Sequence, residues 1–390
     1  MAENNVKQMI GKVFDDIAEG MKTGQFGSKT RVGITTLGSE LGTDNVVKGA
    51  EIAQQRDSSL EVVLIGPNVD SELEQVTADT EEEVDKKMEE LLDSGEIEAC
   101  VTMHYNFPIG VSTVGRMTTP GKGKDMFVAT TTGTTATNRV EAMVKNGING
   151  IIAAKAMGIE DPSVGILNID GVKQVERIFK ELDDNGYPIN LAESGRADGG
   201  HAMRGNDVLS GTPDIMVNDS LTGNILMKVF SSYTTGGSYE SQGYGYGPGI
   251  GEGYDRVVLI LSRASGTPVV ANAISYAGDL VKGNIKSVIK EEFDKVNKAG
   301  LKSILEELNK ESKKTEDAEE VVAPPEETVT ATIDGIDIME LDDAVEELWK
   351  NNIYAESGMG CTGPIVMVNE AKLEEATKAL AKAGYDVAED

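Results

Sequence analysis

The sequence predicts an α/β fold with a mainly parallel sheet and helices on both faces. Short runs rich in β-branched residues alternate with stretches of helical apolar spacing, which is typical of repeated strand–helix–strand units. Apolar residues make up 39% of the 390 positions, so a large core is available. A closed barrel of eight such units is the second choice, because the predicted strands are unevenly spaced and the loops are long.

The elements follow one another in strand–helix pairs. The pairs are 31–36 with 42–56, 60–65 with 81–93, 126–130 with 138–146, 163–169 with 172–185, and 215–218 with 223–230. A further strand at 99–103 leads into a loop punctuated by glycine and proline, and residues 257–261 also have strand character. These elements define an α/β domain over residues 31–308.

Three other segments flank this domain. Residues 1–30 are predicted as a helical extension, laid on the protein body or on a subunit partner, because apolar residues recur every three or four positions from Val6 to Met21. Its mixed polar face argues against a membrane anchor. Residues 309–330 have no apolar periodicity and contain Pro324 and Pro325, so they are predicted as a flexible linker.

Residues 331–390 are predicted as a small acidic α+β domain. A short hairpin is expected around Ile333, Ile336, Ile338 and Leu341, then a helix at 342–351, a strand at 365–368 and a helix at 370–383. Asn369 is the expected N-cap of the last helix, and Gly384 ends it. The domain has 14 acidic and 4 basic residues, so it carries 10 of the 30 net negative charges.

The formal charge of −30 argues against duplex DNA or an anionic membrane surface as a partner, because both would repel the chain. Two cysteines cannot build a disulfide framework, and no signal peptide or membrane-spanning run is evident, so a cytoplasmic protein is expected. No spacing of Cys, His and carboxylates indicates a metal site, and the two histidines, His104 and His201, are isolated.

Cys361 is the most informative single residue. It lies in the glycine-rich stretch Glu356–Pro364, where sharp turns can direct backbone N–H groups at a thiolate or an oxyanion. This setting favours a reactive thiol, and an inert thiol in a tight turn is the alternative. Cys100 has the pattern of a buried strand residue and is expected in the core.

Glycine-rich segments do not match a nucleotide site. The alternating glycines of 245–253 lead into a strand rather than a helix, so NAD binding is not indicated, and residues 236–254, with their interleaved tyrosines, are predicted as a substrate or partner loop. Two strand-to-helix turns are better candidates for binding an anion. They are Asp214–Lys228, with a helix expected from about Gly223 and Lys228 one turn in, and Thr130–Thr137, which includes Gly133 and Thr134.

Several motifs mark a resemblance to known families. Leu37–Gly42, Val47–Ala50, Ser163–Ile169 and Gly211–Lys228 resemble motifs of the phosphate acyltransferases of phospholipid synthesis, over roughly residues 31–290. That resemblance implies a dimeric fold similar to isocitrate and isopropylmalate dehydrogenases, and transfer of an acyl group between a thioester and phosphate. With the N-terminal helix, the linker and the Cys361 motif, the whole chain resembles the component C alpha subunits of glycine, sarcosine and betaine reductases.

The second resemblance implies that a carboxymethyl group on the selenoprotein component A becomes an acetyl thioester on a cysteine, which inorganic phosphate then cleaves to acetyl phosphate. It implies no bound cofactor and a beta subunit similar to β-ketoacyl synthases. The hypothesis assigns Cys361 as the thioester carrier. The residues assigned to phosphate are Thr222, Gly223, Asn224, Lys228, Gly133 and Thr134, with Asn168 and Asp219 positioning it.

Two other functions stay open at this point. One is a phosphate acyltransferase that acts on acyl-carrier protein, with the C-terminal domain in a regulatory role. The other is a non-catalytic acidic subunit that docks a selenoprotein or thioredoxin-like partner.

Overall fold

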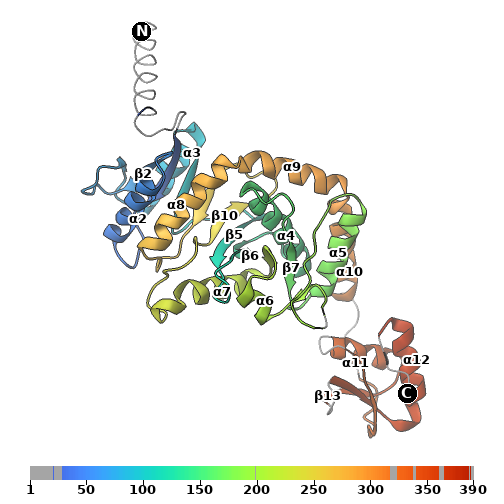
Figure 1. The fold of residues 1–390 in the computed structure, drawn as a ribbon. Helices are drawn as coiled ribbons and strands as arrows, with labels where there is room; N and C mark the ends of the chain where they lie inside the picture. Colours follow the sequence, from blue (N-terminus) through green and yellow to red (C-terminus); the bar gives the residue numbers. More distant parts are fainter. Residues whose placement is uncertain are drawn as a thin grey trace. The chain divides into compact units, whose positions relative to one another are not determined.

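The computed structural model describes residues 21, 29–197, 199–316, 323–336, 340–359, 364–385 and 387. The chain divides into two compact units, residues 1–305 and 306–390. Figure 1 colours the chain from blue at the N-terminus to red at the C-terminus. Apart from Met21, Lys29 and Thr30, the predicted helical extension at 1–30 lies outside the described residues. Among the described helices, none is long and apolar enough to span a membrane.

The first unit is built on an eleven-stranded sheet with the strand order β3-β2-β1-β4-β11-β10-β5-β6-β9-β7-β8. The strands are β1 (Thr30–Thr35), β2 (Leu60–Gly66), β3 (Glu74–Thr77), β4 (Ala99–Thr102), β5 (Val111–Thr118), β6 (Asp125–Thr134), β7 (Val164–Leu167), β8 (Ala202–Met203), β9 (Ile215–Val217), β10 (Gly247–Ile250) and β11 (Val258–Ile260). The helices are α2 (Thr43–Arg56), α3 (Glu81–Ser94), α4 (Arg139–Ala156), α5 (Val172–Asp184), α6 (Gly205–Ser210), α7 (Ser220–Ser232), α8 (Thr267–Lys282) and α9 (Ile285–Lys298), and the boundary between the two units falls within α10 (Leu301–Glu316).

The sheet consists of two parallel blocks that run in opposite directions. Strands β3, β2, β1, β4 and β11 are parallel to one another, and so are β6, β9, β7 and β8. Between the blocks, the pairings of β11 with β10, β10 with β5, and β5 with β6 are all antiparallel. Three reversals in succession place the carboxyl ends of the two blocks at opposite edges of the sheet. The predicted mainly parallel α/β sheet is confirmed.

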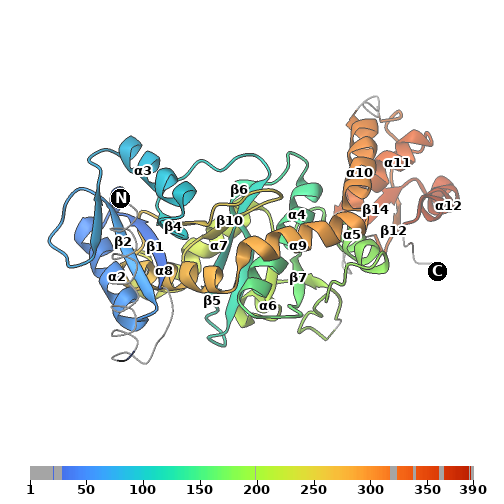
Figure 2. The ribbon, with the colours of Figure 1, turned by 90° about the horizontal axis from the view of Figure 1, so that it is seen from above.

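Helices cover both faces, as the sequence predicts. Leu60 contacts helix α8, whereas Val63, on the opposite side of β2, packs with α3. Val258 and Ile260 share one side of β11, and they contact the clusters under α3 and α7 respectively, so α3 and α7 lie on the same face. On the other face α2, α8, α9, α4 and α5 pack against one another in sequence (Figure 2).

The predicted loop at 236–254 is partly wrong. Residues Gly247–Ile250 form the buried strand β10 in the middle of the sheet, and Tyr246 is buried beside it. The glycines are needed for close packing, since a Cβ on Gly249 would overlap the ring of Phe107. The loop expected after β4 likewise contains strand β5, which pairs with β10 and β6.

Two other boundaries differ from prediction. Helix α10 continues to Glu316, so the first eight residues of the expected linker, 309–316, are helical. Helix α4 continues ten residues beyond the predicted end at 146, because Gly147 and Gly150 allow it to pack closely on Phe179 and Ile215. Helix α4 was therefore predicted but too short, whereas α10, like α8 and α9, was not predicted from the sequence.

The second unit contains a three-stranded antiparallel sheet in the order β12-β14-β13. Its elements are β12 (Ala331–Ile333), α11 (Leu341–Lys350), β13 (Ala355–Met359), β14 (Pro364–Val368), the short 3₁₀ helix η3 (Glu370–Lys372) and α12 (Leu373–Ala383). The predicted hairpin to Leu341 is wrong. Leu341 begins α11, where it is buried with Val345 and Leu348 at helical spacing. Gly384 ends α12, as predicted. Asn369 accepts a hydrogen bond from the Ala371 N–H, but it caps η3, and the N-cap of α12 is Lys372 rather than Asn369.

Candidate functional site

Most of the predicted phosphate residues lie at one edge of the sheet. Gly133 and Thr134 end β6, Asp219 follows β9, and Asn168 follows β7. Because β6, β9 and β7 are adjacent and parallel, their carboxyl ends face the same edge, and β6 continues five residues beyond Ala129, the partner of Val217 at the end of β9. Asn168 and Thr134 are exposed there.

Helix α7 begins three residues earlier than the sequence predicts, because Asp219 is its N-cap. The Asp219 carboxylate accepts hydrogen bonds from the Thr222 N–H at 2.9 Å and from the Thr222 hydroxyl at 3.0 Å. Arg139, the first residue of α4, donates to the same carboxylate at 2.9 Å. The Arg139 guanidinium also lies 3.8 Å from the carboxylate of Asp170, and this ion pair links the segment after β7 to the start of α7. A carboxylate of the chain therefore occupies the place where an anion was expected.

The second predicted anion turn is also capped by the chain. Asn138 accepts a hydrogen bond from the Glu141 N–H at the start of α4. Two threonine hydroxyls of β6 donate to neighbouring strands or segments: Thr130 to Thr113 O at 2.5 Å and Thr131 to Tyr246 O at 2.7 Å. Thr135, directly after the strand, donates to Asn146 Oδ1 of α4 at 2.9 Å. These three hydroxyls of the threonine run therefore hold β6 and its end in place.

Gly223 lies where α7 crosses β6 most closely. A Cβ at this position would overlap Thr130 O and the side-chain amide of Asn218, which itself donates to Thr130 O at 2.8 Å. Asn224, one residue on, donates to Thr131 O at 3.2 Å. The absence of a side chain at Gly223 thus allows α7 to pack this closely on β6.

We expect Gly223→Ala to destabilise the protein by about 1–3 kcal/mol, because the added methyl group must push α7 away from β6. Chemical denaturation monitored by circular dichroism would measure the change. Gly236→Ala is not a neutral control, since Gly236 has a positive φ. Gly205→Ala is suitable, because a Cβ there meets nothing within 4 Å, and an equal loss of stability in both variants would contradict the packing argument.

Lys228 does not lie at the start of α7. It is the ninth residue of the helix, which is ~12 Å along the axis from the first. Its ammonium is 4.0 Å from the Glu240 carboxylate and 5.6 Å from the centre of the Tyr246 ring. Glu240 is buried and accepts hydrogen bonds from the Tyr246 hydroxyl and the Ser265 hydroxyl, each at 3.0 Å. Burial, and secondly the Glu240 charge, raise the pKa of Tyr246.

Arg139 and Glu240 were not predicted as site residues. Arg139 follows an ordinary helix cap, and Glu240 falls in a Gly/Tyr-rich segment, so neither has a local motif. The sequence offers one weak signal for Arg139: a basic residue stands at the start of a helix, where acidic residues are more common.

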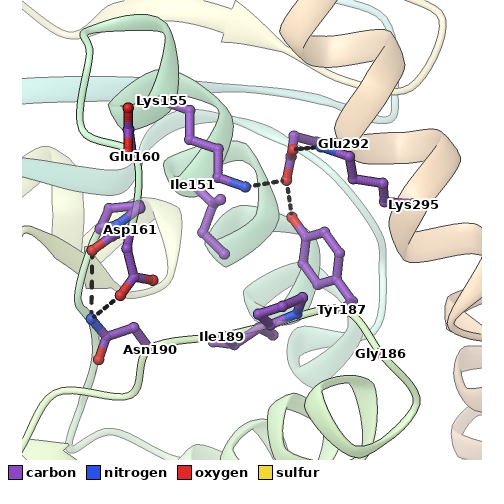
Figure 3. Close-up of a pocket in the computed structure, with 12 residues that line it drawn as sticks. Ile151, Lys155, Glu160, Asp161, Gly186, Tyr187, Ile189, Asn190, Glu292 and Lys295 are labelled. Carbon is purple, nitrogen blue, oxygen red and sulfur yellow. Dashed lines mark hydrogen bonds and ion pairs between the residues drawn. The ribbon is translucent and has the colours of Figure 1, made fainter.

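A cavity of about 330 Å³ lies elsewhere in the first unit, between α4, α9 and the segment after α5 (Figure 3). Its volume is at the lower end of the range for small-ligand pockets. Lys155 and Lys295 both donate to Glu292 there, and Asp161 accepts a hydrogen bond from the side-chain amide of Asn190. None of the predicted site residues lines it.

Cys361 lies outside the described residues. The strands on either side of it form a hairpin, in which Met359 pairs with Pro364. Cys100 is fully buried on β4 against α3, and burial raises the pKa of its thiol, so the prediction of a core cysteine is confirmed. No group of three metal-ligating side chains occurs within the described part of the chain.

A family model described as "Fatty acid synthesis protein" matches residues 30–367. The component C subunit alpha of the glycine/sarcosine/betaine reductase complex from Peptoclostridium acidaminophilum is 65% identical over 381 residues, which are 98% of this chain and 99% of that protein. The chain belongs to the family of component C alpha subunits. The predicted resemblance is confirmed over the whole chain.

The chain also has more distant relatives. The phosphate acyltransferase of Thermotoga petrophila is 27% identical over 237 residues, covering 51% of this chain and 67% of its own length. That of a Bacillus cereus strain is 25% identical over 245 residues, covering 51% and 70%. A solved branched-chain phosphotransacylase from Enterococcus faecalis V583 overlaps 65% of this chain and 99% of its own, at 19% identity and a TM-score of 0.46, which is too loose an overlap to bear on function.

Proposed function

We propose that the chain is the alpha subunit of component C and forms acetyl phosphate by phosphorolysis of an acetyl thioester on Cys361. The observation that carries the proposal is the 65% identity to a component C alpha subunit along nearly the full length of both proteins. The phosphate acyltransferase relatives, such as the one from Thermotoga petrophila that matches 51% of this chain, support the reaction type.

The phosphorolysis step balances without a redox partner. An oxygen of inorganic phosphate attacks the thioester carbonyl, the carbon–sulfur bond breaks, and Cys361 leaves as a thiolate while acetyl phosphate forms. The preceding step, which turns a selenium-bound carboxymethyl group into the acetyl thioester, adds two electrons at the methylene carbon. A thiol beside the selenium would supply them by closing a selenium–sulfur bond, with loss of one carboxylate oxygen as water.

Phosphate would bind at the start of α7, between Asn168, Gly133, Thr134 and residues 219–224. Because the Asp219 carboxylate already holds Arg139 and the Thr222 N–H, phosphate would replace it on these donors. Arg139 then becomes the cationic partner of phosphate. Lys228 has no place in this site, since it lies beside Glu240.

The second unit would bring Cys361 to the phosphate. Glu327, Thr328 and Thr330 are hydrogen-bonded to Lys372, Asn369 and Val368 of the second unit. The ten residues from 317 to 326, between α10 and these contacts, can extend to at most ~36 Å. Within that reach, a tethered thioester meets bound phosphate in an effectively intramolecular reaction. The same tether would let Cys361 visit the selenoprotein component A and the beta subunit of the complex.

The identity of the acylated residue tests the proposal. The reconstituted complex is incubated with labelled substrate without phosphate, digested, and analysed by mass spectrometry. We expect the mass of the peptide that carries Cys361 to increase by ~42 Da, because an acetyl group replaces the thiol hydrogen. Addition of phosphate should remove this increase. Acetylation at another residue, or an adduct that phosphate does not remove, would overturn it.

A phosphate acyltransferase acting on acyl-carrier protein is the second candidate, favoured by the Thermotoga relatives. It predicts that the purified chain alone exchanges an acyl group between acyl-carrier protein and phosphate, whatever residue stands at position 361. The two functions therefore differ in their need for Cys361.

The Asp219→Asn variant tests the phosphate site separately. Asparagine is as good an N-cap as aspartate, but it carries no charge to compete for Arg139. We expect the Kd for inorganic phosphate, measured by calorimetry on the purified chain, to fall several-fold. Arg139→Gln serves as the matched variant and should weaken binding. Unchanged affinity in both variants would place phosphate elsewhere.

A further inference from the structure

The cavity between α4, α9 and the segment after α5 lies at the other edge of the sheet from the predicted phosphate residues. Asp161, which lines it, precedes β7, whereas Asn168 follows β7. Helix α4 reaches from one edge to the other, because Arg139 is its first residue and Lys155, at the cavity, lies ~24 Å further along the axis. The cavity is therefore separate from the phosphate site, and the proposed reaction makes no use of its residues.

The ammonium groups of two lysines make one side of the cavity positive. Lys155 donates to Oε2 of Glu292 at 2.7 Å, and Lys295 donates to Oε1 of the same carboxylate at 2.8 Å. Glu292 is 2% exposed, whereas the side chains of Lys155 and Lys295 are 28% and 55% exposed. An ammonium has three donors, so each lysine can bind a further acceptor. Two positive charges against one carboxylate leave this side with a net positive charge.

The opposite side of the cavity is negative. Figure 3 shows Glu160, Asp161 and Asn190 on one side of the space, and Lys295 and Glu292 on the other. The Asp161 carboxylate accepts a hydrogen bond from the Asn190 side chain at 3.1 Å. Within the described part of the chain, no cation pairs with Glu160 or Asp161. These carboxylates can therefore accept hydrogen bonds from a ligand cation.

Apolar side chains line the space between the two charged sides. Ile151 lies one helical turn before Lys155 on α4 and is 3% exposed, and Figure 3 shows it between Lys155 and Asp161. Ile189 and Tyr187, from the segment after α5, are buried and line the same space. The Tyr187 hydroxyl donates to Glu292 at 2.9 Å, so it is not available to donate to a ligand. The middle of the cavity thus suits a hydrocarbon chain.

We propose that this cavity binds a small aliphatic amino acid whose carboxylate and ammonium are separated by a short chain of methylene groups. The ligand carboxylate accepts hydrogen bonds from Lys155 and Lys295, and the ligand ammonium donates to Asp161. The methylene groups pack against Ile151 and Ile189. A ligand with two charges of the same sign would meet a like charge at one side, so the cavity selects a ligand with one charge of each sign.

The test is a calorimetric titration of the purified full chain with δ-aminovalerate, and we expect one molecule to bind per chain. Valerate and pentylamine are the matched probes, because each keeps the hydrocarbon chain and lacks one charge. Each should bind roughly tenfold more weakly or worse, since a charge-assisted hydrogen bond is lost. Alanine, whose two charges share one carbon, should also bind more weakly. Equal affinity for any of these three probes would overturn the proposal. The measurement needs no partner subunit and no activity, so it is independent of the proposed function.

Two variants place the ligand in this cavity. Lys295→Gln and Asp161→Asn each remove the charge from one side, and each should weaken binding of δ-aminovalerate roughly tenfold. Both residues are exposed at the surface, and circular dichroism checks that the variants are folded. Lys298→Gln is the matched control, because Lys298 is exposed on the same helix and does not line the cavity, so its affinity should equal that of wild type. Failure of the wild type to bind at millimolar concentrations would overturn the proposal, and so would unchanged affinity in both cavity variants.

Discussion

Replacing Cys361 with alanine is expected to lower the rate of acetyl phosphate formation by the reconstituted complex by roughly a thousandfold or more. Without the thiol there is no covalent carrier, so the acetyl group has no activated form from which phosphate can accept it. The measurement is the rate of acetyl phosphate formation, by conversion to the hydroxamate, with component A, the beta subunit and this chain present.

Two further variants make this experiment decisive. Cys361→Ser keeps a nucleophile of similar size but would form an ester, which phosphate cleaves far more slowly, so its rate should also collapse. Cys100→Ala is the matched control, because its thiol is fully buried in the core and remains protonated. Full activity in Cys361→Ala would reject the carrier role, and equal losses in the Cys361 and Cys100 variants would point to lost stability instead.

The fold was predictable where local patterns and tertiary packing agree. Strand β2 and helix α3 are continuous apolar and amphipathic segments with turn signals at both ends, and their boundaries were predicted within one residue. Strand β10 was missed because its sequence, Gly-Pro-Gly-Ile, has low strand propensity. It is a strand because Phe107 and β5 fill the space that side chains would otherwise need. Such packing is set by residues more than a hundred positions away and has no local signature.

The candidate site was predictable only in its location. Asn168, Thr134 and Asp219 were grouped on the resemblance alone, and in the structure they lie at or after the ends of neighbouring parallel strands. The sequence could not indicate that Asp219 would cap α7 and pair with Arg139, because the pair joins residues 80 positions apart. Nor could it place Lys228, since an error of three residues in the start of a helix rotates every later side chain by most of a turn.

Replacing Glu292 with alanine is expected to cost about 3 kcal/mol of stability, the lower end of the range for breaking a buried ion pair. Glu292 is 2% exposed and accepts hydrogen bonds from Lys155 at 2.7 Å, Lys295 at 2.8 Å and the Tyr187 hydroxyl at 2.9 Å (Figure 3). It thus ties α4 to α9 and to the segment after α5. The lower end applies because Lys155 and Lys295 are partly exposed and can regain water. Urea unfolding at pH 7 would measure the loss.

The pH dependence separates the charge of Glu292 from its size. Burial raises the pKa of this carboxyl, but the three hydrogen bonds, led by that from Lys155, outweigh burial and hold the pKa below its usual value. A lowered folded-state pKa means that the contribution is complete above the unfolded value of about 4.3 and is lost as pH falls through the folded value. Glu292→Gln keeps the shape and one acceptor, so it should be less stable than wild type at pH 7, and the difference in stability should narrow as pH falls below the unfolded value of about 4.3. Glu291→Gln is the control, because Glu291 is an exposed neighbour on α9, and this variant should be as stable as wild type throughout. A difference in stability between Glu292→Gln and wild type that stays constant from pH 7 to 3 would mean that the charge of Glu292 contributes nothing.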